Sequence, residues 1–212
     1  MSYLYIYVSY VIPLCIVIPI IIALFRYRFL SFSFKVLLWF LLFSSVGNAI
    51  NIILANYHVA TTTLFHIYTI FEFAFITWFY NIVFAEKSRY ILIALVIIFT
   101  ILCVINFFFI QSGAEVDTYT GTLEAVIIIG YTILYFFKQS SNEQNITWVQ
   151  NGLNWINISF LIYYGCGLCM FISTNYLSRA SQSVNLIVWS VFDTILLIEY
   201  LLFAVGFYKC KT

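Results

Sequence analysis

The chain has 212 residues, of which 64% are hydrophobic, 21% aromatic and only 8% charged, and its mean hydropathy is +1.04. This apolar surface exceeds what one soluble core could bury, which excludes an ordinary soluble domain. The formal net charge of +1, with basic residues dispersed along the chain, also excludes a nucleic-acid-binding surface. We therefore expect an all-α integral membrane protein whose first partner is the lipid bilayer.

Seven apolar segments are long enough to cross a bilayer, which needs roughly 20 residues per helix. They cover approximately residues 4–25, 34–55, 62–84, 90–110, 118–137, 154–175 and 185–207. Pro13 and Pro19 predict a kink in the first segment, because neighbouring helices can satisfy the carbonyl groups that a proline frees. The fifth segment has the weakest signal, since its uninterrupted apolar part covers only residues 125–137. We expect residues 1–212 to form a single seven-helix bundle, or a six-helix bundle if the fifth segment does not span.

Basic residues are distributed unequally between the two sides of the expected bundle. The connections after the first, third and fifth segments, together with the C-terminal end, contain eight of the nine Lys and Arg residues: Arg26, Arg28, Lys35, Lys87, Arg89, Lys138, Lys209 and Lys211. Only Arg179 falls on the opposite side. Cytoplasmic loops carry an excess of Lys and Arg, so we predict an outside N-terminus and a cytoplasmic C-terminus. Small size, short connections and the lack of a targeting signal favour a bacterial inner (cytoplasmic) membrane, and the NIT glycosylation motif at Asn145 falls on the inner side, where it would be idle.

Ionisable residues inside the apolar segments are the clearest functional candidates. Glu72, Asp193 and Glu199 lie well within the third and seventh segments, and His66 and Glu124 lie nearer the outer face. A carboxylate at the centre of a spanning helix costs about 2.5 to 3.5 kcal/mol on insertion scales. No Lys or Arg is expected at that depth. Each acid must therefore be protonated, hydrogen-bonded to neutral groups, hydrated in a cavity or bound to a cation.

Polar residues at helical spacing predict which helix faces turn inward. The inward faces are His66 with Thr69 and Glu72, Ser44 with Asn48 and Asn51, Glu124 with Tyr131 and Tyr135, and Asp193 with Tyr200. His66 and Glu72 are about 120° apart on one helix, which is too far round for direct contact. Glu199 points away from the face of Asp193. We expect a polar vestibule that opens to the outside, with Glu72 near its floor.

A structural role is the alternative for these residues. Buried Asn, Ser, Thr, Tyr and protonated acids also hold membrane helices together, with hydrogen bonds worth about 0.6 to 2 kcal/mol each. This favours a structural role for Asn48 and Asn51. A functional role is favoured for Glu72 and Asp193, because an acid costs more than an amide for the same structural task. For His66 the two roles are evenly balanced.

The cysteines favour packing over chemistry. Cys166 and Cys169 form a CxxC motif in the middle of the sixth segment, without the exposed helix start that activates such thiols. Gly165, Cys169 and Ser173 recur every four residues and predict a face of close helix packing.

Several known seven-helix classes are excluded by particular residues. A retinal protein needs a lysine in the middle of the last helix, and the seventh segment has none before Lys209. Both prolines lie in the first segment, unlike the Pro-Gln pairs in both halves of two-repeat sugar transporters. His58 and His66 are too few for an intramembrane zinc hydrolase. We therefore expect no cofactor.

Three classes of function remain. We favour a non-enzymatic sensory or coupling module with an outward-facing polar pocket, working with a separate partner protein or as a homo-oligomer. The alternative is a pore or transporter for protons, cations or small solutes, such as an oligomeric membrane component of a bacterial defence system. The unpaired acids support that alternative, but the sequence does not place them in a continuous line. A lipid-modifying enzyme using His66 with Glu72 or Asp193 comes third.

Overall fold

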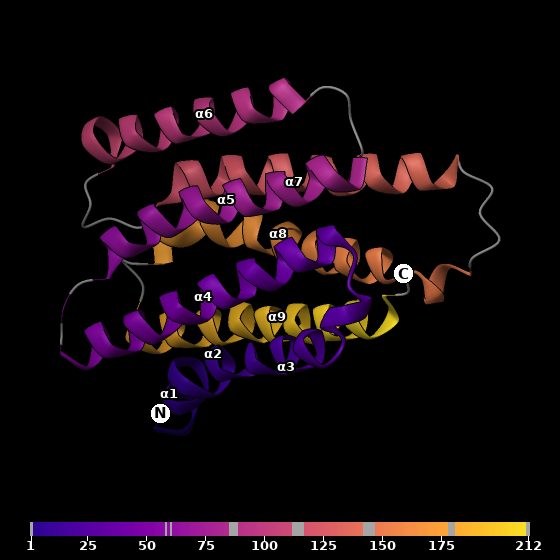
Figure 1. Cartoon of the computed structure of the whole chain (residues 1–212). Helices are drawn as coiled ribbons and strands as arrows, with labels where there is room; N and C mark the ends of the chain where they lie inside the picture. The colour runs from indigo at the N-terminus through magenta and orange to yellow at the C-terminus, as the bar shows by residue number, and fades with distance from the viewer. Residues whose placement is uncertain are drawn as a thin grey trace.

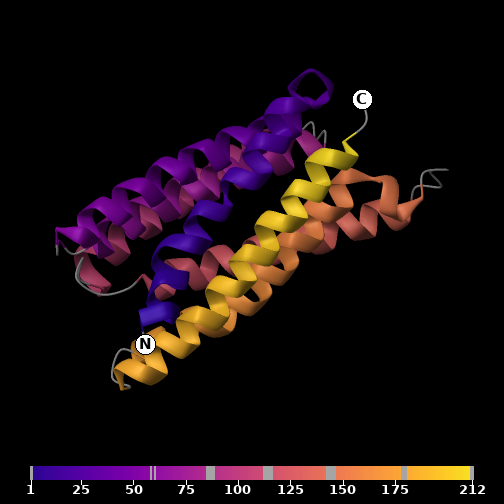
Figure 2. The same cartoon turned by 90° about the horizontal axis from the view of Figure 1, so that it is seen from below.

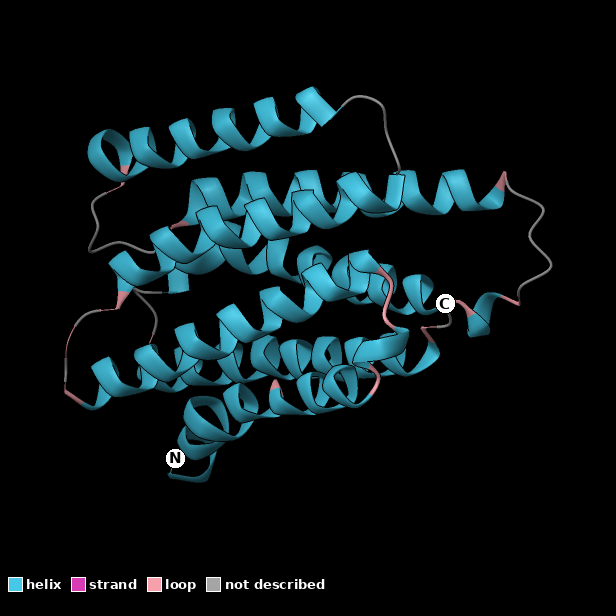
Figure 3. Ribbon diagram, viewed as in Figure 1, coloured by secondary structure: helices cyan, strands magenta, loops and turns pink. Residues whose placement is uncertain are grey.

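The computed structural model describes residues 2–57, 59, 61–84, 89–111, 117–141, 147–177 and 181–210, and these form helices and short connections with no strand (Figure 3). The main helices are α1 (Ser2–Ile6), α2 (Ile12–Cys15), α3 (Val17–Phe25), α4 (Phe32–Asn56), α5 (Thr62–Phe84), α6 (Arg89–Ile105), α7 (Thr118–Ser140), α8 (Gly152–Leu177) and α9 (Gln182–Lys209). Tyr7–Val11 and Asn106–Ile110 form π-helical turns, and Tyr27–Phe29 and Trp148–Gln150 form 3₁₀ turns.

Seven helical stretches within the described residues are long and apolar enough to cross a membrane. They are Tyr3–Phe25, Phe32–Asn56, Thr62–Phe84, Tyr90–Ile110, Thr118–Ser140, Gly152–Thr174 and Ser183–Lys209. The all-α class and the seven expected spans are thereby confirmed, with ends that differ from the expected ones by a few residues. The chain is a helical bundle of membrane type.

The first span is interrupted, as its prolines predict. It begins as α1, continues through the π-helical turn, and breaks at Ile16 between α2 and α3. Proline has no N–H group and its ring crowds the preceding turn, so Pro13 and Pro19 account for the irregular helix.

The fifth span, helix α7, runs the full distance from Thr118 to Ser140. Its first turns carry little apolar character because their polar side chains face the protein interior, where Thr118, Thr120 and Glu124 are buried. The six-helix alternative is therefore wrong.

The helices lie roughly side by side, with α8 packed between α7 and α9 (Figure 1). Helix α3 packs on α9, α4 packs on α5, and α6 lies at the edge of the bundle against α5. The two ends of the chain lie at opposite ends of the bundle (Figure 2). We call the end where α3 and α9 finish the basic end, because Arg26, Arg28, Lys35, Lys138 and Lys209 lie at or next to helix ends there, and the opposite end the His66 end, because α5 begins there.

A layer of apolar side chains fills the bundle on the basic-end side of its middle. It consists of Ile76, Phe79, Ile128, Phe160 and Phe203, each of which is 0 or 1% exposed. The Phe160 ring centroid lies 5.3 Å from that of Phe203 and 6.0 Å from that of Phe79. We call this set the apolar layer. It is continuous with the main hydrophobic core.

Helices α8 and α9 approach closely through two glycines. A Cβ atom added to Gly152 would lie 2.5 Å from the carbonyl oxygen of Gly206, and one added to Gly206 would lie 2.6 Å from Cδ1 of Ile156. The expected packing face of Gly165, Cys169 and Ser173 is wrong, because nothing lies within 4 Å of a Cβ added to Gly165 and the other two residues are exposed. Small residues permit close packing, but they do not decide which face of a helix meets its neighbour.

Candidate functional site

A buried polar network lies at the His66 end, where three helices meet. His66 Nδ1 on α5 lies 3.4 Å from Asp117 Oδ2, and the two residues are 5% and 7% exposed. Asp117 also caps α7, since its Oδ1 accepts a hydrogen bond from the Thr120 backbone N–H at 3.3 Å and another from the Thr120 hydroxyl. The Asn106 amide, at the end of α6, donates to the same Oδ1 at 3.0 Å. One carboxylate thus joins α5, α6 and α7.

Gln111 extends this network along the connection between α6 and α7. Its Oε1 accepts from Asn106 Nδ2 at 3.1 Å and from the Thr118 backbone N–H at 3.2 Å. Its Nε2 donates to the Thr118 hydroxyl at 2.7 Å. We call the set the rim network, and its members are His66, Asn106, Gln111, Asp117, Thr118 and Thr120.

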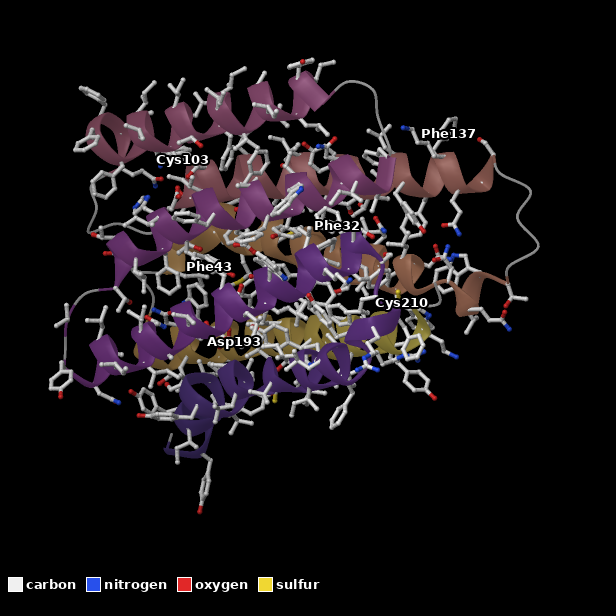
Figure 4. All side chains as sticks on the ribbon, viewed as in Figure 1. Phe32, Phe43, Cys103, Phe137, Asp193 and Cys210 are labelled. Atoms are coloured by element: carbon white, nitrogen blue, oxygen red, sulfur yellow. The ribbon has the colours of Figure 1, made fainter. Side chains whose placement is uncertain are left out.

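Apolar and thiol groups enclose the rim network. The Phe107 ring stands edge-on to the His66 ring at 5.3 Å between centroids. Cys103 of α6 faces α7, where its thiol interacts with the Thr120 hydroxyl (Figure 4). The network is therefore built into the protein rather than displayed on its surface.

Three glutamates lie deeper in the bundle, on three different helices. Glu72 of α5 interacts electrostatically with both Glu124 of α7 and Glu199 of α9. The Tyr164 hydroxyl of α8 donates to Glu72 Oε1 at 2.8 Å. Glu124 and Glu199 are 3% and 6% exposed, whereas Glu72 is half-buried. We call Glu72, Glu124 and Glu199 the acid cluster.

Hydroxyl groups, rather than cations, surround the acid cluster. Tyr68, Tyr163, Tyr164 and Tyr200 all interact with Glu72. The Tyr68 hydroxyl lies 2.8 Å from Ser44 Oγ. The described Lys and Arg side chains lie at the basic end, so none of them offsets these carboxyl groups.

The rim network and the acid cluster form one column of ionisable groups. Glu124 follows Asp117 by seven residues on α7, about 10 Å along the helix, and the two interact electrostatically. Glu72 follows His66 on α5 by about 9 Å. The sequence did not place the acids in a line, but the fold links Asp117, Glu124, Glu72 and Glu199 in succession. We call this succession, with His66 at its start, the polar column.

The apolar layer ends the column. Ile76, Ile128 and Phe203 each follow an acid of the cluster by four residues, which is one helical turn toward the basic end. Helix α8 runs the other way, and Phe160 precedes Tyr164 by the same spacing. The carboxyl groups of the acid cluster therefore stop at this layer, whereas neutral buried polar groups such as Thr77, Tyr80 and Asn157 continue beside it toward the basic end.

The expected inward faces are only partly correct. His66, Thr69 and Glu72 do turn toward other helices, but they do not form one site: His66 pairs with Asp117, Glu72 pairs with Tyr164, and the Thr69 hydroxyl donates to the carbonyl oxygen of Phe65 at 3.0 Å. The last of these bonds is within α5, which gives Thr69 a structural role.

The expected arrangement of α9 is only partly correct, because Asp193 does interact electrostatically with Tyr200 but Glu199 does not point away from the other acids. Glu199 belongs to the acid cluster, whereas Asp193, which Figure 4 labels on α9, is half-buried and has no interaction with Glu72, Glu124 or Glu199 among the described residues. The two residues are about 120° apart around the helix, so only one can face the cluster. Asp193 precedes Thr194, whose hydroxyl lies 3.1 Å from that of Tyr7 in the first span.

The remaining expected residues lie beside the column. Tyr200 is buried and interacts with the half-buried Asn48 of α4, and Asn51 is half-buried farther along the same helix. Tyr131 and Tyr135 are buried on α7 but lie beyond Glu124, toward the basic end.

Two groups of polar residues were missed by the sequence reasoning. Asp117 is not among the residues expected from the sequence, although an Asp directly before the first helical residue is a common N-cap signal. The second group is a set of buried asparagines on α8. The Tyr80 hydroxyl donates to Asn157 Oδ1 and the Tyr135 hydroxyl to Asn154 Oδ1, each at 2.8 Å. No pattern within a single helix could have predicted these pairs.

The described part of the chain contains no group of three or more His, Cys, Asp and Glu residues that could hold a metal ion. Cys166 and Cys169 are free thiols exposed on α8. The polar column instead contains acids, a histidine and tyrosines, which can exchange protons with one another.

Comparisons with protein-family models, with curated protein sequences and with solved structures find no match. Function therefore has to be inferred from the polar column itself.

Proposed function

We propose that this protein is a non-enzymatic sensory or coupling module of a membrane, with a buried polar interior that begins at the His66 end. A change of proton occupancy or ligand binding in the polar column shifts the packing of α5, α7 and α9. A separate partner protein, or a further copy of the chain, reads that shift at the basic end.

The observation that carries this proposal is that the polar column stops halfway. A conducting path needs polar groups or water along its whole length, because ions and protons do not cross a dry apolar section. The apolar layer, whose side chains are 0 or 1% exposed, interrupts the succession of carboxyl groups, and the buried polar groups beside it, Thr77 and the Tyr80–Asn157 pair, are neutral. A half-column suits a protein that receives a signal from one side without passing the solute to the other.

The distribution of charge supports an orientation for this module. Arg26, Arg28, Lys35, Lys138 and Lys209 lie at the basic end, and cytoplasmic ends of membrane helices are enriched in such residues. We therefore propose that the His66 end and the N-terminus face outward, that the C-terminus is cytoplasmic, and that the membrane is a bacterial inner membrane.

A pore or transporter for protons or cations is the second candidate. It is favoured by the electrostatic linkage of Glu124 and Glu199 to Glu72, which supplies the succession of sites that the sequence lacked. A lipid-modifying enzyme is less well supported, since the proposed dyad of His66 with Glu72 or Asp193 is replaced by His66 with Asp117.

Proton flux into proteoliposomes under a pH gradient, and then under a membrane potential, separates the first two candidates. We expect the wild-type protein to be silent and Phe203→Ala to leak protons several-fold above empty liposomes, because the substitution opens the apolar layer next to Glu199. Adding Glu199→Gln to Phe203→Ala should suppress that leak. Phe160→Leu, a smaller change in the same layer, is the variant to use if Phe203→Ala does not fold.

Phe99→Ala is the matched control, because Phe99 is equally buried but packs against Phe73 at the α5–α6 contact, away from the layer. It should remain silent. Wild-type flux that Glu72→Gln abolishes would reject the sensory role and make the protein a transporter. Crosslinking in native membranes should also capture a protein at the basic end, and capture of neither a partner nor a second copy would contradict the coupling role.

A further inference from the structure

One corner of the basic end gathers cations from three separate parts of the chain. Arg26 and Arg28 come from the turn after α3, Lys35 comes from the first turn of α4, and Lys209 is the last residue of α9. We call these four residues the basic corner. The packing of α3 against α9 brings Lys209 beside Arg26 and Arg28.

Aromatic rings show how close these cations are to one another. The Arg26 guanidinium carbon lies 5.3 Å from the centroid of the Tyr208 ring, and Lys209 Nζ lies 6.0 Å from the same centroid. Arg26 also lies 5.9 Å from the Phe29 ring, and Lys35 Nζ lies 5.0 Å from the ring of Tyr27. Tyr27 and Phe29 belong to one short 3₁₀ turn, which also contains Arg28. The four cations therefore surround the 3₁₀ turn Tyr27–Phe29 and the ring of Tyr208.

Backbone contacts hold this corner in shape. The Arg26 guanidinium donates to the carbonyl oxygen of Tyr208. The Cys210 thiol lies 3.7 Å from the carbonyl oxygen of Phe29 (Figure 4). Arg26 thus joins the end of α9 to the end of the first span, and this structural task leaves Arg28, Lys35 and Lys209 as the cations available to a ligand.

No described carboxylate balances the charge of the basic corner. The acids within the described residues are Glu72, Asp117, Glu124, Asp193 and Glu199, and they lie in the middle of the bundle or at the His66 end. Four like charges held close together favour an anionic ligand.

The surroundings of the corner identify the class of anion. Phe25 is 86% exposed and Phe32 is 59% exposed, and aromatic rings of this kind mark the level of the lipid headgroups. Below them, Ile18, Ile21 and Leu24 are exposed along α3 and provide an apolar surface for acyl chains. A soluble acidic protein or a nucleic acid would not contact that apolar surface. Basic pockets between spanning helices are typical binding sites for anionic lipid headgroups.

We propose that the basic corner binds the phosphate headgroup of an anionic phospholipid, with the acyl chains lying on α3. Arg28, Lys35 and Lys209 contact the phosphate, and Arg26 positions Tyr208 beside it. The binding is independent of the sensory role proposed above, since a transporter or a purely structural protein with this corner would bind the same lipid.

Native mass spectrometry of the full chain tests the site through the lipids that stay bound. Protein is exchanged into micelles with equal amounts of phosphatidylglycerol and phosphatidylcholine, and bound lipid is counted. We expect preferential retention of phosphatidylglycerol. Arg28→Gln/Lys35→Gln/Lys209→Gln should reduce that retention by at least about tenfold, because each interfacial basic residue adds to the attraction of an anionic lipid.

Lys138→Gln is the matched control, because Nζ of Lys138, on α7, lies 4.6 Å from the centroid of the Phe84 ring at the end of α5 and outside the basic corner. It should retain phosphatidylglycerol within about twofold of the wild type, because it removes one charge from the same end of the bundle and leaves the basic corner intact, and it is compared with Arg28→Gln and Lys209→Gln singly. If the triple variant does not fold, Arg28→Gln and Lys209→Gln singly should each reduce retention several-fold. Equal losses in Lys138→Gln and in the corner variants would overturn the site. So would full competition by millimolar inorganic phosphate, which would identify a soluble anion as the ligand.

Discussion

Gly152→Ala is expected to destabilise the protein by about 3 kcal/mol or more, as overpacking against an immobile backbone does. The new Cβ would lie 2.5 Å from the carbonyl oxygen of Gly206, 3.0 Å from Cζ of Phe34 and 3.1 Å from the backbone nitrogen of Cys210. Two of these three atoms belong to the backbone of α9 or its end, so no side-chain rotation can relieve the contact. Helix α8 must move away from α9, and thermal unfolding of the purified protein in detergent measures the loss.

Gly165→Ala is the control on the same helix. Nothing lies within 4 Å of a Cβ added there, so alanine should be neutral or stabilise the helix by up to about 1 kcal/mol through its better helix propensity. Equal destabilisation by the two substitutions would mean that α8 and α9 do not meet at Gly152 and Gly206. A stabilising Gly152→Ala would exclude the close approach outright.

Asp117→Ala is the second substitution with a large expected effect, again about 3 kcal/mol or more. It removes the cap of α7, worth about 1 kcal/mol, and leaves the Asn106 amide and the Thr120 hydroxyl without the acceptor they share. It also removes the partner that lies 3.4 Å from His66 Nδ1. Hydrogen exchange should rise at the start of α7 and the end of α6, because the carboxylate links these segments to α5.

Asp117→Asn and Asp193→Ala separate the contributions. The amide oxygen of Asn can still cap α7, so we expect Asp117→Asn to lose about half of the effect of Asp117→Ala. Asp193 is half-buried, stands outside the rim network and interacts only with Tyr200 among the described groups, so Asp193→Ala should change the unfolding free energy by about 1 kcal/mol or less. A loss as large as that of Asp117→Ala would contradict the assignment of Asp117 as the junction of three helices.

The acid cluster shows why sequence reasoning could name candidates without assembling them. Glu72, Glu124 and Glu199 stand out because a carboxyl group within an apolar segment is costly wherever the helix lies. Their grouping depends on how α5, α7 and α9 are rotated about their own axes. The helical period shows which residues share a face, but it cannot show what that face meets, which is why Glu199 rather than Asp193 joined the cluster.

The sequence by itself determined the membrane character, the seven spans, the irregular first span and the concentration of basic residues at one end. Each of these follows from the apolar length, proline content or charge of consecutive residues, which no packing arrangement can change. Only the tertiary structure decided that His66 meets Asp117, that Gly152 meets Gly206, and that Lys209 joins Arg26 and Arg28. These residues lie far apart in the chain, and their contacts arise from the rotation and depth of whole helices, which are set jointly by every side chain in the interface.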